Sequence, residues 1–162
     1  MALSLPKPAG TGKKETISLD SAASHLLEEC RMVLPGIQAL FGFQLIAVFN
    51  QGFGEKLSHA EQLVHLAAII LTALSMALVM TPAALHSLSE PKEVSERFVW
   101  MASNMVLAGM LPLALAVGLD AYLVASIIAK SDLVGIAVAV ALVSVFALLW
   151  LALPRRERAR HG

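Results

Sequence analysis

Asp120 is the residue whose type and position most directly suggest chemistry, because it is the only charged residue in the apolar stretch 98–128. A continuous helix over that stretch is about 46 Å long, which exceeds the roughly 30 Å core of a bilayer. If the helix continues to Ile128, Asp120 lies about 12 Å below the outer surface and is the only carboxylate inside the membrane. If the span ends at Leu119 instead, Asp120 lies at the interface.

His65 and Glu61 are the candidate partners of Asp120, since they enter the membrane on the same side. A carboxylate beside an imidazole can relay protons or bind a cation. The alternative is a structural polar contact at the outer rim of the protein.

A second polar set, Glu29, Arg31 and His86, is expected where the apolar stretches meet the opposite, cytoplasmic surface. Glu28 and Arg97 belong to the same region. Because the set combines acidic and basic groups, we interpret it as a salt-bridge cluster that ties helices together. The alternative is a ligand site.

Two glutamines, Gln38 and Gln44, lie inside the first apolar stretch. Depth along the helices places Gln38 near Asn104 and Gln44 near Thr72. We therefore expect interhelical hydrogen bonds within these two pairs. Polar groups inside a membrane also mark substrate paths, so Gln38 is an alternative candidate for an ion path.

Four apolar stretches must position these residues, and they span about 32–49, 63–85, 98–128 and 133–153. Each is long enough, or nearly so, to cross a bilayer as an α-helix, and backbone groups in lipid must bond internally. Pro112 is expected to kink the third span. Short connections make neighbouring helices antiparallel. The sequence therefore predicts an all-α, polytopic membrane protein with four transmembrane helices in an up-down antiparallel bundle.

The predicted transmembrane domain covers residues 19–154, between a flexible tail at 1–18 and a basic tail at 155–162. Residues 19–30 carry apolar residues at helical spacing, which predicts an amphipathic segment that leads into the first span or, alternatively, lies at the membrane surface. The capping-box pattern Ser58-His59-Ala60-Glu61 opens the second. Small residues four apart, Gly135/Ala139 and Ala114/Gly118, allow close approach of helices.

Composition excludes several classes of protein. Of the 162 residues, 57% are hydrophobic and 15% are charged, which is far from a disordered chain. A single cysteine, Cys30, excludes an internal disulfide framework and a multi-cysteine metal site. No spacing typical of catalytic, cofactor-binding or metal-binding residues occurs, so we expect neither an enzyme nor a cofactor.

The formal net charge of zero, from twelve basic and twelve acidic residues, hides an asymmetry. With four spans, ten of the twelve Lys and Arg residues fall on one side, and only Lys56 and Lys130 fall on the other. The positive-inside rule then places both termini in the cytoplasm. The arginine-rich tail at 155–160 is expected to contact anionic lipid headgroups. We expect no nucleic-acid partner, because an overall basic excess is absent.

Several motifs carry a family resemblance: residues 29–43 (ECRMVLPGIQALFGF), 81–86 (TPAALH), 120–122 (DAY) and 150–155 (WLALPR). Over about residues 25–155, the chain resembles a family of small bacterial four-helix membrane proteins of unknown function. Some members of that family are labelled sodium:proton antiporters. The resemblance implies a bacterial plasma membrane and singles out Glu29, Arg31, Gly36, Gln38, Gly42, Pro82 and His86. In the family an arginine often follows the histidine, whereas this chain has Ser87.

Two functions fit these observations. The first is an accessory or structural component of the bacterial cytoplasmic membrane, oligomeric with copies of itself, whose polar groups hold the bundle together. The alternative is a small ion- or proton-coupled transporter or channel subunit. It would use either Asp120 with His65 or the set Glu29, Arg31 and His86.

Overall fold

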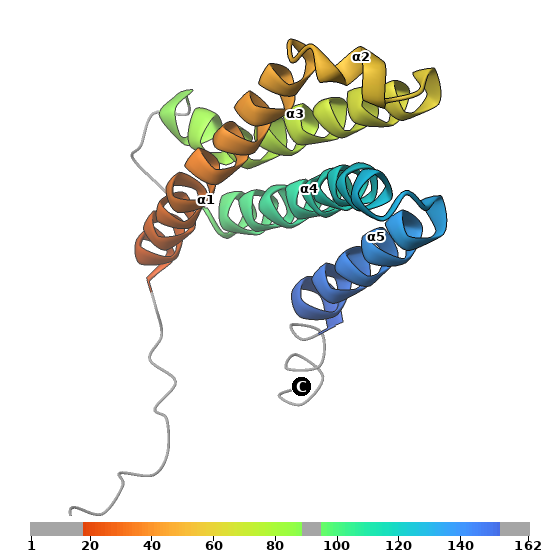
Figure 1. Cartoon of the computed structure of the whole chain (residues 1–162). Helices are drawn as coiled ribbons and strands as arrows, with labels where there is room; N and C mark the ends of the chain where they lie inside the picture. The colour runs from red at the N-terminus through yellow and green to blue at the C-terminus, as the bar shows by residue number, and fades with distance from the viewer. Residues whose placement is uncertain (1–17, 89–94, 153–162) are drawn as a thin grey trace, which may run out of the picture.

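The computed structural model describes residues 18–88 and 95–152, and these residues form helices with no strand. The long helices are α1 (Leu19–Val48), α3 (His59–Leu88), α4 (Glu96–Ala129) and α5 (Asp132–Ala147). A short helix, α2 (Gly52–Lys56), connects α1 to α3, and a π-helical turn, η1 (Leu148–Ala152), continues α5 (Figure 1).

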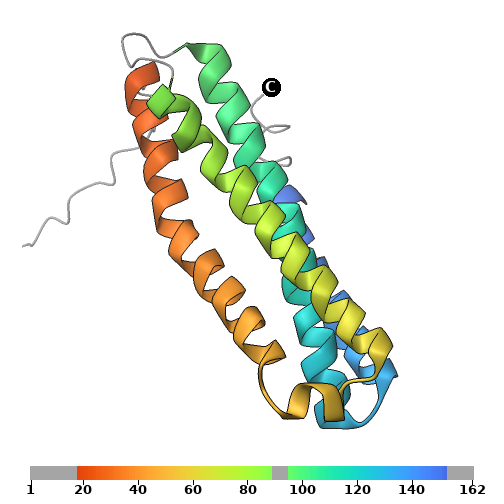
Figure 2. The ribbon, with the colours of Figure 1, turned by 90° about the horizontal axis from the view of Figure 1, so that it is seen from above.

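Four helical segments are long and apolar enough to cross a membrane, and they are Ser21–Val48, His59–Ser87, Glu96–Ala129 and Asp132–Trp150. They run lengthwise beside one another, with α2 and the α4–α5 turn together at one end (Figure 2). We call this end the α2 end of the bundle. The prediction of an all-α bundle is confirmed, with four helices long and apolar enough to cross a membrane.

Helix α1 is longer than the predicted span, because the amphipathic lead-in and the span form one helix. It begins after Ser18, whose side chain accepts a hydrogen bond from the Ser21 amide at 3.3 Å. Its buried positions recur every seven residues, at Ala23, Cys30, Ile37 and Gln44. Such a repeat keeps one narrow seam of a helix against its neighbours. Gln44 is therefore the last member of the buried seam of α1.

The starts of α3 and α4 show why these helices begin where they do. Ser58 and Glu61 form the predicted capping box: the Ser58 amide donates to Glu61 Oε2 at 2.7 Å, and the Glu61 amide donates to Ser58 Oγ at 3.4 Å. Ser95 caps α4 by accepting from the Phe98 amide at 3.2 Å. Helix α4 then continues through Pro112 to Ala129, so the helix itself extends beyond Leu119.

Helix α4 lies at the centre, between α3 and α5 (Figure 1), and α1 packs on α3 and more lightly on α4. Glycines set the close approach of α4 and α5. A Cβ atom added at Gly118 would lie 2.6 Å from Val143 Cγ2, and one added at Gly135 would lie 2.8 Å from the Tyr122 carbonyl oxygen. The two glycines of the predicted small-residue pairs thus lie at the interface between these two helices of one chain, whereas Ala137 and Ala141, a third pair with this spacing, are exposed.

Substitution Gly135→Ala is expected to destabilise the protein by about 1–3 kcal/mol, because the new methyl group meets a backbone oxygen that moves only if α4 moves. The control is Gly36→Ala, at a helical position with open space around it. It should be neutral or stabilising by up to about 1 kcal/mol, since alanine is the better helix former. Equal melting temperatures for the two variants would contradict the close α4–α5 approach.

Thermal unfolding in detergent can be followed with a thiol-reactive fluorogenic dye. The single cysteine, Cys30, is 4% exposed in the folded protein and becomes accessible to the dye on unfolding.

Two local features differ from the sequence prediction. The short connection expected between the first two spans contains helix α2, and Asn50 Oδ1 accepts from the Gly52 amide at 3.1 Å just before it. The last predicted span changes from α-helix to a π-helical turn at Leu148. The tails predicted at 1–18 and 155–162 lie outside the described residues, apart from Ser18.

Candidate functional site

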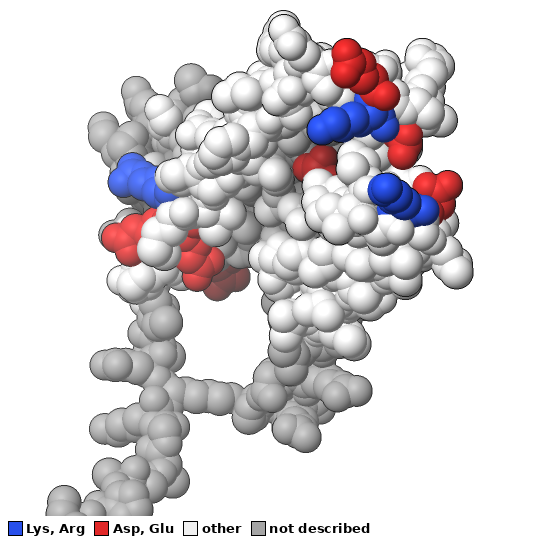
Figure 3. Space-filling view, in the orientation of Figure 1, with Lys and Arg blue, Asp and Glu red and all other residues white. Residues whose placement is uncertain are grey.

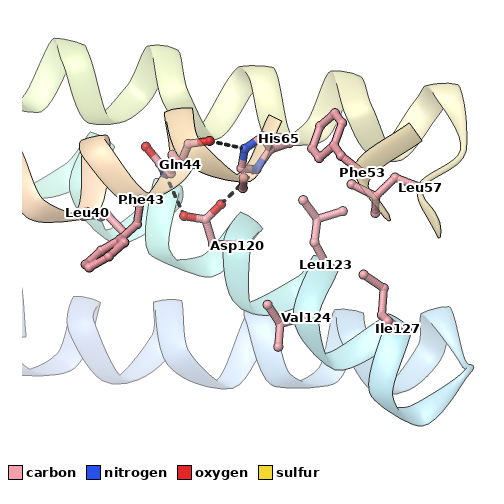
Figure 4. Close-up of a pocket in the computed structure, with 11 residues that line it drawn as sticks. Leu40, Phe43, Gln44, Phe53, Leu57, His65, Asp120, Leu123, Val124 and Ile127 are labelled. Carbon is pink, nitrogen blue, oxygen red and sulfur yellow. Dashed lines mark hydrogen bonds and ion pairs between the residues drawn. The ribbon is translucent and has the colours of Figure 1, made fainter. Parts of the chain in front are cut away.

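Three helices bring polar side chains together near the α2 end of the bundle (Figure 4). Gln44 lies in the last turns of α1, His65 in the second turn of α3, and Asp120 in the last third of α4. Gln44 Nε2 donates a hydrogen bond to Asp120 Oδ2 at 2.7 Å. His65 Nδ1 lies 3.5 Å from Asp120 Oδ1, and His65 Nε2 lies 2.9 Å from the backbone oxygen of Gln44. We call these residues the Gln44–His65–Asp120 site.

The contacts of the His65 ring indicate which nitrogen carries a hydrogen. Nε2 faces a carbonyl oxygen, which only accepts hydrogen bonds, so Nε2 carries a hydrogen. In a neutral imidazole Nδ1 is then an acceptor, and it faces Asp120 Oδ1, which is also an acceptor when the carboxylate is ionised. The contact is therefore attractive only when one proton lies between them, either on the imidazole or on the carboxyl group.

The site is largely withdrawn from the surface. Gln44 is 3% exposed and His65 is 7% exposed, while the Asp120 side chain retains 22%. A net charge in such surroundings costs free energy. Gain or loss of a proton at the site therefore changes the stability of the folded protein. Gln44 Oε1 is buried and has no hydrogen-bond partner among the described residues. One acceptor of the site is therefore unused.

A pocket of about 270 Å³ ends at this site. The eight other residues of its wall are apolar: Leu40, Phe43, Ala47, Phe53, Leu57, Leu123, Val124 and Ile127 (Figure 4). Phe53 also meets the His65 ring edge-on, with 5.3 Å between ring centroids. Phe43, Val124 and Ile127 are exposed large hydrophobic residues. The pocket therefore opens on an apolar surface of the kind that faces lipid.

The predicted pairing of Asp120 with His65 matches the structure, whereas Glu61 is engaged in the capping box of α3. Sequence reasoning missed Gln44 as a partner of Asp120. The seven-residue repeat of buried positions in α1 is the signal that identifies it, because Gln44 is the polar member of that series.

The two predicted interhelical hydrogen bonds are wrong. Thr72 Oγ1 donates to the Ala68 carbonyl of its own helix at 3.0 Å, and Asn104 Nδ2 donates to the Trp100 carbonyl at 3.0 Å. Gln38 is exposed on α1. Short polar side chains in a helix bond readily to the preceding turn, so equal depth does not make them partners.

The second predicted set does not come together in the described part of the chain. Glu29 and Arg31 are exposed, and His86 packs beside the Phe98 ring with 5.8 Å between centroids. Within residues 18–88 and 95–152, no ion pair joins Glu29, Arg31 and His86 to one another. The ion pair near the start of α1 is His25–Glu28, at 3.9 Å. Most charged side chains in the visible face lie at the two ends of the bundle (Figure 3).

The described residues contain no group of three or more His, Cys, Asp or Glu side chains that could hold a metal ion. What the Gln44–His65–Asp120 site can do chemically is hold one proton, or hold a cation in its place.

Comparison with known proteins places the chain in a family. No curated protein and no solved structure matches it. The profile of a family of unknown function, DUF6328, matches residues 13–154, which is most of the chain and includes the whole Gln44–His65–Asp120 site. The chain therefore belongs to the DUF6328 family of unknown function.

Proposed function

We propose that this protein is a small ion-transport component of the membrane that exchanges a proton for a cation at Asp120. The observation that carries the proposal is the facing pair His65 Nδ1 and Asp120 Oδ1, 3.5 Å apart, in which Nε2 is already committed to a carbonyl. With one proton the pair is neutral overall, and without it the pair carries one negative charge. A cation that takes the place of the proton restores neutrality, which is the chemistry that antiport needs.

Location within the protein supports the same proposal. Asp120 is the only charged residue between Arg97 and Lys130 on α4, and it faces a pocket rather than a helix interface alone. Ionisable groups inside membrane proteins commonly mark ion paths. We further propose the orientation expected from the charge distribution, with both termini in the cytoplasm, so that the α2 end faces outward.

The test is proton movement in liposomes that contain the purified protein and an internal pH-sensitive dye. With an imposed cation gradient, the wild-type protein is expected to change the internal pH. Asp120→Asn should reduce this change to the rate of protein-free liposomes. The control Asp132→Asn makes the same chemical change at an exposed carboxylate on α5 and should keep the wild-type rate. Equal rates for all three proteins and for empty liposomes, across Na⁺, K⁺, organic-cation and pH gradients, would overturn the proposal.

A second candidate function is structural, as part of an accessory membrane component. It is favoured by the connectivity of the site: the Gln44–Asp120 bond joins α1 to α4, and the His65–Gln44 bond joins α3 to α1. Hydrogen bonds between helices in membranes contribute about 0.6 kcal/mol each on average. In that case Asp120→Asn leaves every measured property unchanged, since asparagine can keep both contacts.

A further inference from the structure

The pocket beside Asp120 has a shape and composition that suit one kind of ligand. Its walls are apolar over most of their extent, and its polar groups are confined to the Gln44–His65–Asp120 site. Pockets of this type bury an apolar ligand body and orient it through a few polar contacts. A volume of about 270 Å³ accommodates a small aromatic or branched alkyl group.

The atoms that can still form hydrogen bonds at the polar end of the pocket are acceptors. The Gln44 amide nitrogen already donates to Asp120, and His65 Nε2 already donates to the Gln44 carbonyl. Gln44 Oε1 is buried without a partner among the described residues, and an ionised carboxylate accepts more hydrogen bonds than the two contacts that Asp120 has. A ligand that fits must therefore donate hydrogen bonds.

The charge at the polar end favours a cation. Among the described residues no Lys or Arg lines the pocket, so an ionised Asp120 is balanced there only when His65 is protonated. The other charged residues of the neighbouring elements lie outside the pocket lining, and in the described residues near the α2 end they are Glu55, Lys56, Glu61, Lys130 and Asp132. Phe43 and Phe53 add aromatic rings, whose faces attract cations.

The same geometry disfavours a divalent metal ion as the preferred occupant. Metal cations such as Ca²⁺ or Mg²⁺ take six or more oxygen ligands, whereas the polar end offers the Asp120 carboxylate and Gln44 Oε1 within apolar walls. The exposed apolar rim formed by Phe43, Val124 and Ile127 instead gives access from the lipid phase. The ammonium group of a lipophilic amine donates hydrogen bonds to the free acceptors and neutralises the Asp120 carboxylate. Its apolar part packs against the apolar walls.

We infer that this pocket binds a lipophilic primary ammonium ion, which enters from the lipid-facing side and replaces the proton at the Gln44–His65–Asp120 site. The inference rests on the proposed function and names its cation. The ammonium group donates to the Asp120 carboxylate and Gln44 Oε1, the apolar body occupies the pocket, and the displaced proton leaves for water.

The experiment measures binding of 3-phenylpropylammonium to the full-length protein in detergent by calorimetry. The neutral analogue 3-phenylpropanol and NaCl are tested in parallel. Wild-type binding should strengthen as pH rises through the range in which the amine stays charged, because ligand and proton compete. Asp120→Asn should raise Kd by about tenfold or more, which corresponds to about 1.4 kcal/mol. Asp132→Asn is the matched control and should bind like wild type.

A second variant, Ala47→Phe, fills the pocket without altering the polar groups and should also raise Kd by about tenfold or more. Equal affinity for the amine and the alcohol, or equal amine affinity in wild type and Asp120→Asn, would overturn the inference by showing apolar partitioning only. Absence of amine binding with intact proton movement in liposomes would overturn the inference and leave the proposed function standing. Absence of both would overturn both.

Discussion

Replacement of Asp120 by alanine is expected to destabilise the protein by about 2–3 kcal/mol, whereas replacement by asparagine is expected to leave its stability unchanged. Alanine removes the acceptor of Gln44 Nε2 and the partner of His65 Nδ1, both buried. Interhelical hydrogen bonds in membranes reach about 1.7 kcal/mol each, and a buried donor left unpaired adds to the loss.

Asparagine behaves differently because it resembles the protonated carboxyl group. Its side-chain oxygen can accept from Gln44 Nε2, and its amide nitrogen can donate to His65 Nδ1, which is an acceptor in the neutral imidazole. The site then keeps both contacts but has lost its exchangeable proton. Unchanged stability together with lost proton movement is therefore the result that separates an ion-transport site from a structural contact.

The measurement is the melting curve of each variant in detergent, followed by the reactivity of the buried Cys30 thiol. Asp132→Ala is the control, because this carboxylate is exposed in the first turn of α5 and its removal should change stability little. If asparagine destabilises the protein as much as alanine does, the proton of the resting pair lies on the imidazole, in an ion pair of imidazolium and carboxylate, rather than on the carboxyl group.

Most of the fold follows from the sequence because the membrane restricts the choices. An apolar stretch in lipid must be helical, so the four long helices could be located from length and charge alone. The continuation of α4 beyond Leu119 was the open question, and the short connection at residues 130–131 decides it. Helix α2 and the π-helical turn could not be found in this way, since both are local departures of one or two turns.

The contacts of the site were only partly predictable, because they depend on how each helix is rotated about its own axis. Depth along a helix can be counted from the sequence, but a contact also requires that the side chains face each other. The pairs Gln38–Asn104 and Gln44–Thr72 match in depth, yet Gln38 is exposed and Gln44 faces Asp120. Rotation of α1 follows from its seam of buried residues.

The same rotation accounts for the second predicted set. Cys30 occupies a buried position of the α1 seam. Its neighbours Glu29 and Arg31 are turned about 100° to either side of it, because a helix has 3.6 residues per turn. Both are consequently exposed. Charged residues that flank a buried position on a helix need not meet groups on other helices, however suggestive their types are.

Coupling between His65 and Asp120 should itself depend on pH, and a double-mutant cycle measures it. With His65→Ala, Asp120→Ala and the double variant, the unfolding free energies near neutral pH are expected to give an interaction of about 1–2 kcal/mol, in the range found for residues in direct contact. The physical reason is the contact of Nδ1 with Oδ1 at 3.5 Å, which is attractive when one of the two groups carries a proton. A cycle of His65→Ala with Asp132→Ala is the control and should be additive within about 0.5 kcal/mol.

When the pair carries no proton, two acceptors face each other, so the interaction should fall toward zero or become unfavourable as pH rises. The His65 Nε2 bond to the Gln44 carbonyl does not involve Asp120 and therefore cancels in the cycle. A His65–Asp120 interaction of constant size across this pH range would mean that the contact holds no exchangeable proton, and the proposed proton exchange would lose its chemical basis. An interaction that disappears with rising pH, in a protein that stays folded, would identify this contact as the place where the proton is held.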